Sequence, residues 1–514
     1  MVIIKKKITL FFPTPFPYNR PWRGVPLSLL AISRVLDKEN YTIKIISRSL
    51  FDNPEKEILE NIKDSVCLGI TAMTGFQIWD GLKIAKIVKS NFPEKPIIWG
   101  GWHPSILPEQ TVKDVGVDIV VNGQGDITFP KLVHALEESK NLREIKGITF
   151  KEEGGIISTT PSNLEDINDL PSLPYQLVDI EKCLINTEYG KRTIPYISSY
   201  GCPHRCGFCV EQMVNKRRWV AINAEKVIED WEYLVKKYNV DSIAIYDSNF
   251  FIDKKRVYDI CRGLLKKKIK IKWGNVNGRI PQLAKYEKEI WEVMEKSGCS
   301  MILTGAESGS QDALDFISKD MHVEEIIEFT KLCKKYNIKV LYSFLVGLPW
   351  SQNQKENSKF INQEYKSTFS LIDSLLKISK LNRFTYYVFL PYPGAPLFSR
   401  AVNLGLEIPK NLNEWSTYLM SPEDAFKINI NQHWITPSQA KITAMLTQYI
   451  FGLMDLDSYY VLKLRIPAGV KRVLFTCAYQ IGLAFVKFRW HFKFFRFPID
   501  YWVFALFYKY GKLI

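Results

Sequence analysis

Three cysteines stand close together in the middle of the chain, at a spacing that suits a metal cluster. Cys202, Cys206 and Cys209 lie in the run Tyr-Gly-Cys-Pro-His-Arg-Cys-Gly-Phe-Cys. Thiolates ligate iron-sulfur clusters, and a cluster of four irons held by three protein sulfurs leaves one iron open to an exogenous ligand. An open iron indicates chemistry on a substrate more than simple electron storage.

A zinc site is the main alternative for these thiols. Structural zinc usually takes its four ligands from two separated pairs, and the sequence has no matching second pair. His204 could serve as a fourth ligand, although it lies between the cysteines. The other cysteines are scattered along the chain, which favours buried thiols over a disulfide framework.

The cysteine run follows a predicted strand in a region where strands and helices alternate. Six such units fit an incomplete parallel barrel as well as a second open sheet. In both cases the active site lies at the carboxyl ends of the strands. The expected strands are residues 194–198, 242–247, 270–276, 301–304, 340–346 and 384–389.

The cysteine loop resembles that of the radical S-adenosylmethionine (SAM) superfamily. In that family the open iron of a 4Fe–4S cluster binds the amino and carboxylate groups of SAM. One electron then splits SAM into methionine and a 5'-deoxyadenosyl radical, which takes a hydrogen atom from the substrate. The resemblance covers residues 192 to 400 and implies a partial (β/α)6 barrel of the TIM type.

The segments after the second and third strands of this region also resemble the family's SAM site. By this resemblance, Asp247 or Asn249 would accept a hydrogen bond from the ammonium group of SAM. Arg279 would clamp its carboxylate through two hydrogen bonds. This chain has Asp247 to Phe250 where the family usually has a motif containing Glu.

The segments after the fourth and fifth strands complete the expected SAM site. The resemblance implies that Glu307 or Ser308 binds the ribose hydroxyls. Phe208 and the backbone of Val346 and Gly347 would flank the adenine. Taken singly, such polar loop residues also fit simpler roles in turns and caps.

The amino-terminal region has its own alternation of strands and helices, which predicts a flavodoxin-like, doubly wound (Rossmann-like) parallel sheet. The expected strands are residues 8–12, 42–47, 66–71, 96–99 and 118–121, and the expected helices are residues 25–36, 77–88 and 129–136.

The strand ends of this first region resemble the cobalamin-binding domain that precedes the barrel in one branch of the superfamily. An open sheet builds its ligand crevice at this edge, and glycines there let the backbone approach a flat ligand. The Asp-x-His-x-x-Gly motif that ligates cobalt is absent, and Gly-Gln-Gly-Asp stands where Gly-Glu-Gly-Glu is usual. A degenerate domain is the alternative. The residues implied to bind cobalamin are Thr71, Thr74, Gly100, Gly101, His103, Gly123 and Gly125, of which His103 fits a turn residue better than an axial ligand.

These patterns divide the chain into four parts. We expect a cobalamin-binding-like domain over residues 1–145, a linker with one hairpin over 146–190, the radical SAM core over 191–400 and a mostly helical region over 401–514.

The formal net charge is +15, and ten Lys and Arg residues after Leu462 are opposed only by Asp500. Interleaved aromatic and basic residues there suit a helical lid, a peripheral membrane contact or, less well, nucleic acid. Its apolar runs, 473–486 and 499–508, are shorter than the roughly 20 residues that span a bilayer.

The sequence thus predicts an enzyme that uses a 4Fe–4S cluster, SAM and cobalamin to modify an unactivated carbon. Methyl transfer and cyclisation or rearrangement both remain open, on a small-molecule or lipid-like substrate, with flavodoxin or ferredoxin as the reducing partner. The amino terminus lacks the order of a secretory signal, so we expect a cytoplasmic protein, with peripheral contact at the inner face of the membrane.

Two other functions are alternatives. A radical methylthiotransferase acting on tRNA would normally bring a second set of three cysteines in its first domain, where this chain has only Cys67. An iron-sulfur electron carrier or scaffold would need a fourth ligand to complete the cluster.

Overall fold

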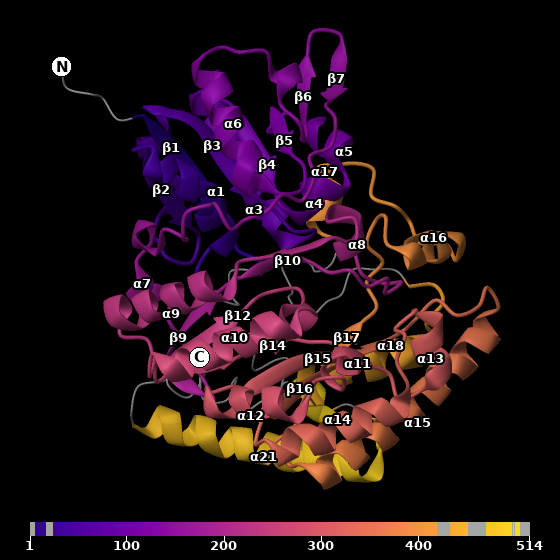
Figure 1. Cartoon of the computed structure of the whole chain (residues 1–514). Coiled ribbons are helices and arrows are strands. Elements are labelled where there is room, and N and C mark those ends of the chain that lie inside the picture. Colours follow the sequence, from indigo (N-terminus) through magenta and orange to yellow (C-terminus); the bar gives the residue numbers. More distant parts are fainter. Residues whose placement is uncertain are drawn as a thin grey trace.

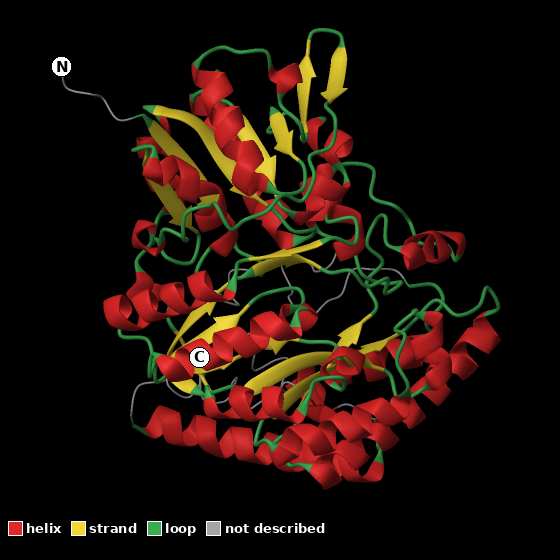
Figure 2. Ribbon diagram, in the orientation of Figure 1, coloured by secondary structure: helices red, strands yellow, loops and turns green. Residues whose placement is uncertain are grey.

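The computed structural model describes residues 6–16, 24–418, 432–450, 469–495, 497 and 499–503. The amino-terminal sheet lies at the top of Figure 1, the second set of strands lies below it, and helix α21 (Val470–Phe492) runs along the bottom. Figure 2 shows helices on the outside of both sets of strands.

The first sheet has the strand order β2-β1-β3-β4-β5-β6-β7. Its first five strands in chain order pair in parallel, and the β6–β7 hairpin extends one edge in the antiparallel sense. Interior positions of β1 and β3 are buried on both faces, as expected for a parallel sheet covered by helices. The strands are β1 (Lys7–Phe12), β2 (Thr42–Ser47), β3 (Ser65–Thr71), β4 (Ile97–Gly100), β5 (Ile119–Val121), β6 (Ile148–Glu152) and β7 (Gly155–Ser158).

Six helices accompany this sheet, and their ends follow local sequence rules. Asn53 caps α2 by accepting from the backbone N–H of Lys56, and Pro54 occupies the first turn, where its missing N–H costs nothing. The helices are α1 (Leu27–Lys38), α2 (Pro54–Ile62), α3 (Phe76–Asn91), α4 (Trp102–Ile106), α5 (Pro108–Val112) and α6 (Gly125–Glu137). The predicted doubly wound sheet is confirmed; α2 was not among the expected helices, and the hairpin carries the sheet past residue 145.

The second unit contains the expected partial barrel. Its strands form two neighbouring sheets, β13-β12-β9-β8 and β14-β15-β16-β17. The third expected strand is broken at Asn275, whose φ of 51° separates β13 from β14, and Trp273 also bridges to Cys299 beside β15. The strands are β8 (Ile185–Thr187), β9 (Gly190–Tyr196), β12 (Ser242–Ile245), β13 (Lys272–Gly274), β14 (Val276–Asn277), β15 (Met301–Glu307), β16 (Lys339–Val346) and β17 (Arg383–Val388).

Helices connect these strands and cover the outside of the barrel. The elements of the connections are α7 (Ile180–Cys183), β10 (Ser199–Gly201), α8 (Glu211–Val214), β11 (Trp219–Ala221), α9 (Ala224–Tyr238), α10 (Lys254–Lys266), α11 (Ile280–Leu283), α12 (Lys288–Lys296), α13 (Gln311–Phe316), α14 (Val323–Lys335) and α15 (Gln354–Ile378). The carboxyl-terminal region adds α16 (Pro396–Asn403), α17 (Leu412–Ser416), α18 (Pro437–Ala444) and α21. The predicted helical character of that region is therefore confirmed within the described residues.

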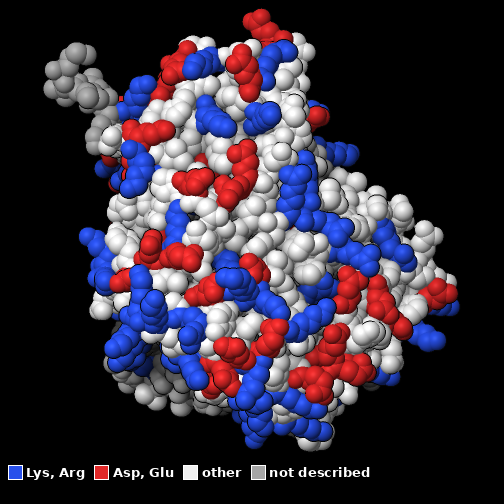
Figure 3. Space-filling view, in the orientation of Figure 1, with Lys and Arg blue, Asp and Glu red and all other residues white. Residues whose placement is uncertain are grey.

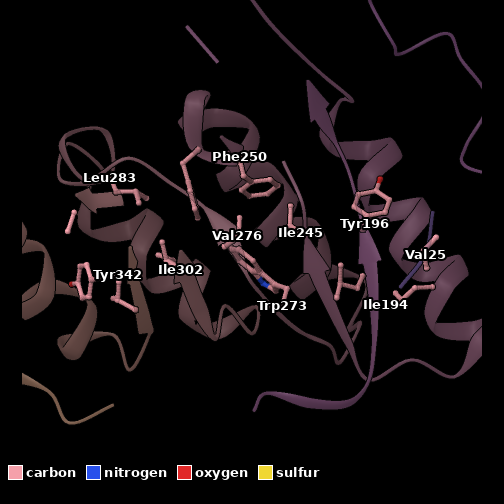
Figure 4. Packing of buried hydrophobic residues seen from close by; sticks show 14 of the residues in the cluster. Val25, Ile194, Tyr196, Ile245, Phe250, Trp273, Val276, Leu283, Ile302 and Tyr342 are labelled. Carbon is pink, nitrogen blue, oxygen red and sulfur yellow. The ribbon is translucent and has the colours of Figure 1, made fainter. Parts of the chain in front are cut away.

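One hydrophobic core runs through both units. Figure 4 shows Val25, from the segment before α1, beside Ile194 and Tyr196 of β9, and the same cluster continues to Ile302 and Tyr342. A second cluster covers the other face of the first sheet. Leu412, Trp415 and Tyr418, which follow the barrel in sequence, belong to that second cluster. The carboxyl-terminal region therefore helps to build the core of the amino-terminal unit.

The surface charge and the helix hydropathy bear on the expectations for the whole chain. Lys and Arg are interspersed with Asp and Glu on the face seen in Figure 3. No helix within the described residues is both long enough and apolar enough to cross a membrane.

Candidate active site

The cysteine loop lies between β10 and α8 and is held by its backbone. The amide nitrogen of Gly207 donates to the carbonyl of Ile317 at 2.7 Å, and its own carbonyl accepts from Leu397 at 2.9 Å. The Gln212 side chain donates to the carbonyls of Cys206 (3.0 Å) and Cys209 (3.1 Å). These bonds fix the path of the loop independently of its thiols.

The three thiols themselves are partly exposed and close enough to influence one another. Cys202, Cys206 and Cys209 each have intermediate exposure. Burial raises the pKa of the Cys209 thiol to about 12, and the neighbouring Cys206 and Cys202 contribute to the increase. Three partly exposed thiols on one loop are the type of ligand that an iron-sulfur cluster takes.

Gly201 permits the sharp turn just before Cys202. Its φ is +86°, and an added Cβ would lie 2.0 Å from the carbonyl oxygen of Arg218, which directly precedes β11. Only glycine fits a left-handed conformation with so close a backbone neighbour.

Asp247 is fully buried at the end of β12, and its carboxylate is already engaged. It accepts from the amide (2.6 Å) and hydroxyl (2.7 Å) of Ser198 and from the hydroxyl of Ser199 (2.6 Å). Burial raises the pKa of Asp247, while nearby Arg256 and the two serines oppose that increase. In this structure Asp247 therefore holds the strand that leads into the cysteine loop.

Asn249 lies beside the cysteine loop. Its side-chain oxygen accepts from the amide of Phe251 at 3.2 Å, its Nδ2 donates to Gln282 at 3.2 Å, and the Cys202 thiol is a near neighbour. Of the two residues expected to meet the ammonium group of SAM, Asn249 is the nearer to the cluster loop.

Arg279 has two buried nitrogens that make no close hydrogen bond to the described residues. Its Nη1 donates to Nδ1 of His204, and its Nη2 lies 3.7 Å from the carboxylate of Asp320. Burial lowers the pKa of His204 to about 4, aided by the cations Arg279 and Lys319, so its imidazole is neutral and can accept. Nε and Nη2 of Arg279 are buried with no hydrogen-bond partner among the described residues. These two nitrogens form the edge of a guanidinium that fits a carboxylate.

Glu307 is paired with a lysine that sequence reasoning missed. The Lys319 Nζ lies 2.7 Å from Glu307 Oε1 and 5.9 Å from the centroid of the Phe208 ring. Burial alone would lower the pKa of Lys319, but Glu307 and the Cys206 thiol raise it above its usual value. Lys319 thus lies between the cysteine loop and the expected ribose-binding residues. The sequence around Lys319 does not mark it, because its partner Glu307 lies on another element, at the end of β15.

Ser308, Val346 and Gly347 occupy the remaining expected positions. Ser308 is buried beside Thr368, with 3.4 Å between their hydroxyl oxygens. Val346 is fully buried, and the Gly347 carbonyl accepts from the indole N–H of Trp434 at 2.9 Å. The carboxyl-terminal region therefore contacts the fifth strand end at the position expected to flank adenine.

The expected cobalamin residues of β3 and β4 form one connected strand edge. Thr71 and Gly100 end these two strands. Thr74 Oγ1 lies 3.0 Å from Nδ1 of His103, and burial lowers the pKa of His103 to about 3. His103 Nε2 is buried without a hydrogen-bond partner in the described part of the chain. Gly101 has a φ of +98°, and a Cβ added there would lie 2.8 Å from the carbonyl oxygen of Ala72.

The edge is completed by the loop after β5, where two glycines differ in their surroundings. A Cβ added at Gly100 would contact Val121 at 3.7 Å, and one added at Gly123 would contact Ser162 at 3.9 Å, so neither position is tightly packed. A Cβ added at Gly125 would lie 2.9 Å from Ile32, so this glycine serves the packing of α6 on α1. The two loosely packed positions fit the close approach of a large flat ligand.

A helix contact joins the first sheet to the cysteine loop of the barrel. Helix α4, which directly follows Gly101, contacts α8, which directly follows the cysteine loop, and the two helices lie near each other in Figure 1. The carboxyl edge of the first sheet is therefore adjacent to the cysteine loop of the barrel.

Comparison with known proteins agrees with this geometry. Residues 196–358 match the model of the radical SAM superfamily, and residues 20–133 match that of the B12 binding domain. An uncharacterized methyltransferase of Pyrococcus horikoshii is 28% identical over 404 residues, which cover 77% of this chain and 82% of that protein. The anaerobic magnesium-protoporphyrin IX monomethyl ester cyclase of Rubrivivax gelatinosus is 24% identical over 330 residues, 63% of this chain and 57% of the cyclase.

A solved structure shares the fold. The cobalamin-dependent S-adenosylmethionine radical enzyme OxsB with aqua-cobalamin bound aligns with a TM-score of 0.70 at 18% identity, over 94% of this chain and 72% of that chain. The B12 match in the first domain does not favour the methylthiotransferase, electron-carrier or scaffold alternatives. The chain therefore combines a radical SAM domain with an amino-terminal B12 binding domain, and it is an enzyme whose cofactors are a 4Fe–4S cluster, SAM and cobalamin.

Proposed function

We propose that this protein is a methyltransferase that modifies an unactivated carbon of an apolar, lipid-like small molecule. The observation that carries the proposal is the contact of α4 with α8, because it sets the glycine-lined sheet edge against the cysteine loop. Methyl transfer also fits the likeness to the Pyrococcus methyltransferase. Cyclisation or rearrangement is the second candidate, and the likeness to the cyclase, named for a porphyrin ester, favours it.

The cluster side of the site has a defined set of proposed roles. Cys202, Cys206 and Cys209 ligate the iron-sulfur cluster. When bound, the cluster supplies the electron that splits SAM, and cobalamin carries the methyl group. The Nε and Nη2 of Arg279 bind the carboxylate of SAM, which is supported by their burial with no contact closer than the 3.7 Å between Nη2 and Asp320. Asn249 receives its ammonium group, which is supported by its position beside the Cys202 thiol.

The nucleoside half of SAM is proposed to lie between the fourth and fifth strand ends. Glu307, or the neighbouring Ser308, accepts from the ribose hydroxyls. Lys319 holds the Glu307 carboxylate in place, as their 2.7 Å contact supports. Phe208 and the Val346–Gly347 backbone flank the adenine.

The corrinoid is proposed to lie along the edge formed by β3, β4 and β5. Gly100 and Gly123 let the backbone approach the ligand closely, and a Cβ at either position would meet protein atoms only at 3.7 Å or more. Thr71, Thr74, Gly101 and Gly125 shape the loops around it. His103 is held by Thr74 (3.0 Å) and covered by Trp415 (ring centroids 5.4 Å apart), which supports the role of a loop-shaping residue.

An exposed tyrosine supports a place for the substrate beside the second barrel strand. Tyr246, just past the end of β12, keeps 51% of its surface exposed. Its ring is therefore available to a bound molecule. An apolar substrate would lie against this ring, next to the cysteine loop that follows β10.

Product analysis tests the reaction. The chain is reconstituted anaerobically with iron, sulfide and cobalamin, reduced, and given SAM with a total lipid extract. Methyl transfer yields S-adenosylhomocysteine and 5'-deoxyadenosine in equal amounts, because one SAM donates the methyl group and a second supplies the radical. Cyclisation or rearrangement yields 5'-deoxyadenosine alone.

Cys206→Ala should abolish both products, whereas Cys333→Ala, a matched change at a buried thiol on α14, should retain them. Products unaffected by Cys206→Ala would contradict the proposal.

We further propose that the chain acts in the cytoplasm and receives electrons from a flavodoxin or ferredoxin. Cluster thiols stay reduced in that compartment, and small redox partners there bind through modest, transient interfaces. Replacing dithionite with reduced flavodoxin in the assay tests this partner, and no turnover under that condition would contradict it.

The peripheral membrane contact expected from the sequence is supported by α21, which is apolar on two faces. Its inner face buries Tyr479, Val486 and Trp490, and the Trp490 ring packs edge-on against Phe369 of α15 at 5.2 Å. A helix on a protein surface normally turns a polar face outward. The outer positions here are also apolar and each is more than half exposed: Val473, Leu474, Ile481, Phe485, Phe488 and Phe492.

The charge around α21 favours an anionic lipid surface as its partner. Asp500 is the one acidic residue after Leu462, and it pairs with the buried Arg489. Lys487 is exposed beside the apolar positions. Apolar side chains interleaved with cations are typical of helices that lie in the headgroup layer.

Vesicle flotation tests this contact. The whole chain should float with vesicles containing phosphatidylglycerol and much less with pure phosphatidylcholine. Phe485→Ser/Phe488→Ser should remain in the dense fraction. Tyr233→Ser/Phe360→Ser, which removes comparable exposed rings from α9 and α15, should float like the parent. Equal flotation of both double variants, or dimerisation through α21 in place of flotation, would contradict the membrane contact.

A further inference from the structure

Strand β10 links the barrel to the cysteine loop, and its side chains alternate between the two domains. Successive residues of a strand point to opposite sides. The hydroxyl of Ser199 donates to Asp247 of the barrel at 2.6 Å. The hydroxyl of the next residue, Tyr200, donates to Asp126 of the first domain at 3.1 Å. Two buried carboxylates, one from each domain, therefore hold the segment that ends two residues before Cys202.

Asp126 is itself rigidly held. It lies in the first turn of α6, where the helix dipole stabilises a negative charge. Its carboxylate also pairs with Arg34 of α1, and the two side chains are only 6% and 1% exposed. A buried, paired carboxylate has little freedom to move, because losing either partner would leave a charge unpaired in the interior.

The position of Asp126 gives this contact a functional meaning. It directly follows Gly125 in the loop after β5, which belongs to the sheet edge proposed for the corrinoid. Tyr200 lies two residues before the first cluster ligand. The Tyr200–Asp126 hydrogen bond is therefore a short, side-chain connection between the two proposed cofactor sites.

We propose that Asp126 and Tyr200 are positioning residues that set the separation of the cluster loop and the corrinoid edge. The proposal rests on the function proposed above. A reaction that uses both centres needs their spacing held, because a displacement of about 1 Å can lower a rate by about 100-fold. Neither residue takes part in the chemistry; Asp126 acts through Tyr200, and Tyr200 acts through the loop that follows it.

The competing explanation is that the Tyr200–Asp126 hydrogen bond only helps the two domains adhere. A second contact allows an experiment to distinguish this explanation from a positioning role. The side chain of Gln176 donates to Asp37 of the first domain at 3.0 Å, at an exposed position. It joins the first domain to the linker that precedes the barrel. A pure adhesion role predicts that losing either contact has the same effect on the cysteine loop.

The first test is made on the chain without cofactors. Tyr200→Phe keeps the ring and its packing and removes only the hydroxyl. By hydrogen exchange and mass spectrometry, the amides of residues 198–209 should exchange about fivefold faster, which corresponds to the loss of one buried hydrogen bond of about 1 kcal/mol. Gln176→Leu should leave these amides unchanged. Unchanged exchange in Tyr200→Phe, or an equal increase in Gln176→Leu, overturns the proposal.

The second test uses the reconstituted enzyme. Tyr200→Phe should retain iron and corrinoid at the parental stoichiometry, with a broader distribution of cluster-to-cobalt distances by pulsed electron paramagnetic resonance. Its kcat should fall at least about tenfold with little change in KM for SAM. A parental distance distribution and kcat overturn the proposal. If the parental chain retains no corrinoid while its loop exchange still depends on Tyr200, the proposed function fails and the loop-positioning role of the pair stands.

Discussion

The Nζ of Lys319 lies 2.7 Å from Oε1 of Glu307, and each side chain is only 9% exposed. Two local features make room for this pair. Gly305 has no side chain where a Cβ would lie 1.9 Å from the Glu307 carboxylate and 2.6 Å from Lys319. Glu307 adopts a φ of +59°, beside an irregular register between β15 and β16. Such backbone strain is found at functional sites, where the surrounding structure compensates for it.

Loss of Lys319 should strongly destabilise the chain. Lys319→Met leaves the Glu307 carboxylate buried without its cation, at a cost of about 3–5 kcal/mol. The urea midpoint, followed by circular dichroism, should fall accordingly, and Lys319→Met/Glu307→Gln should recover much of the loss. Lys331→Met removes a surface pair with Glu328 and should change stability by less than about 0.5 kcal/mol. A Lys319→Met midpoint equal to that of Lys331→Met would refute a buried ion pair.

Adjacent glycines in the first domain should respond differently to alanine. Gly101→Ala forces a φ of +98° on a residue with a Cβ and brings that Cβ within 2.8 Å of a carbonyl oxygen, so thermal stability should fall by more than about 1 kcal/mol. Gly100→Ala meets nothing closer than 3.7 Å and should melt like the parent. Corrinoid retention after desalting should nevertheless fall in Gly100→Ala, because the added methyl group occupies the space proposed for the ligand. Full retention in Gly100→Ala would exclude close ligand contact there.

Stability should depend on pH through Glu364 of α15. Neither carboxyl oxygen has a hydrogen-bond partner among the described residues, and burial raises the pKa of Glu364 from 4.5 to about 8, although nearby Ser308 and Trp350 oppose the increase. A folded pKa above the unfolded one favours the folded state most at low pH, and this contribution is lost as pH rises from 4.5 towards 8.

Glu364→Gln should remove that dependence. The parental melting temperature should fall as the pH rises across this range, because the free energy of unfolding falls by up to several kcal/mol. The melting temperature of the variant should depend less on pH. Glu356→Gln, at an exposed position of the same helix, should follow the parent. Superimposable profiles for the parent and Glu364→Gln would show that the carboxyl group does not stay neutral in the fold.

Trp415 should be essential to the first domain although it follows the barrel in sequence. Its side chain is fully buried, its ring lies 5.4 Å from that of His103, and its indole N–H donates to Gln110 at 2.5 Å. Trp415→Ala should cost about 3–5 kcal/mol and increase hydrogen exchange in α4 and α5. Trp502→Ala, 57% exposed, should leave stability unchanged. If Trp415→Ala increased hydrogen exchange in the barrel but not in α4 and α5, this assignment would be contradicted.

Much of this architecture follows from local sequence patterns. Alternating apolar runs located the parallel strands to within a few residues, because buried strands need continuous β-branched and aromatic residues. The spacing of Cys202, Cys206 and Cys209 predicted a loop at a strand end, and the structure has one there. The third barrel strand, expected over 270–276, is broken at Asn275, since one residue in the left-handed region interrupts pairing without altering the hydropathy pattern.

The contacts that shape the site depend on distant partners and were not predicted. Nothing near Asp247 in sequence shows that Ser198 and Ser199 occupy its carboxylate. Lys319 looks like an ordinary surface lysine until β15 places Glu307 against it. The expected roles of the individual SAM- and cobalamin-binding residues remain predictions, and the variants above test them.

The return of α17 to the first sheet also has a consequence during synthesis. Gln110 and Trp415 are separated by 305 residues. At about 5–20 residues per second, the amino-terminal domain leaves the ribosome roughly 15–60 s before the helix that completes its second core cluster. During that interval the edge formed by α4 and α5 is uncovered. The nascent first domain is therefore a natural client for a chaperone, and a ribosome stalled before residue 415 would present a domain that cannot finish folding.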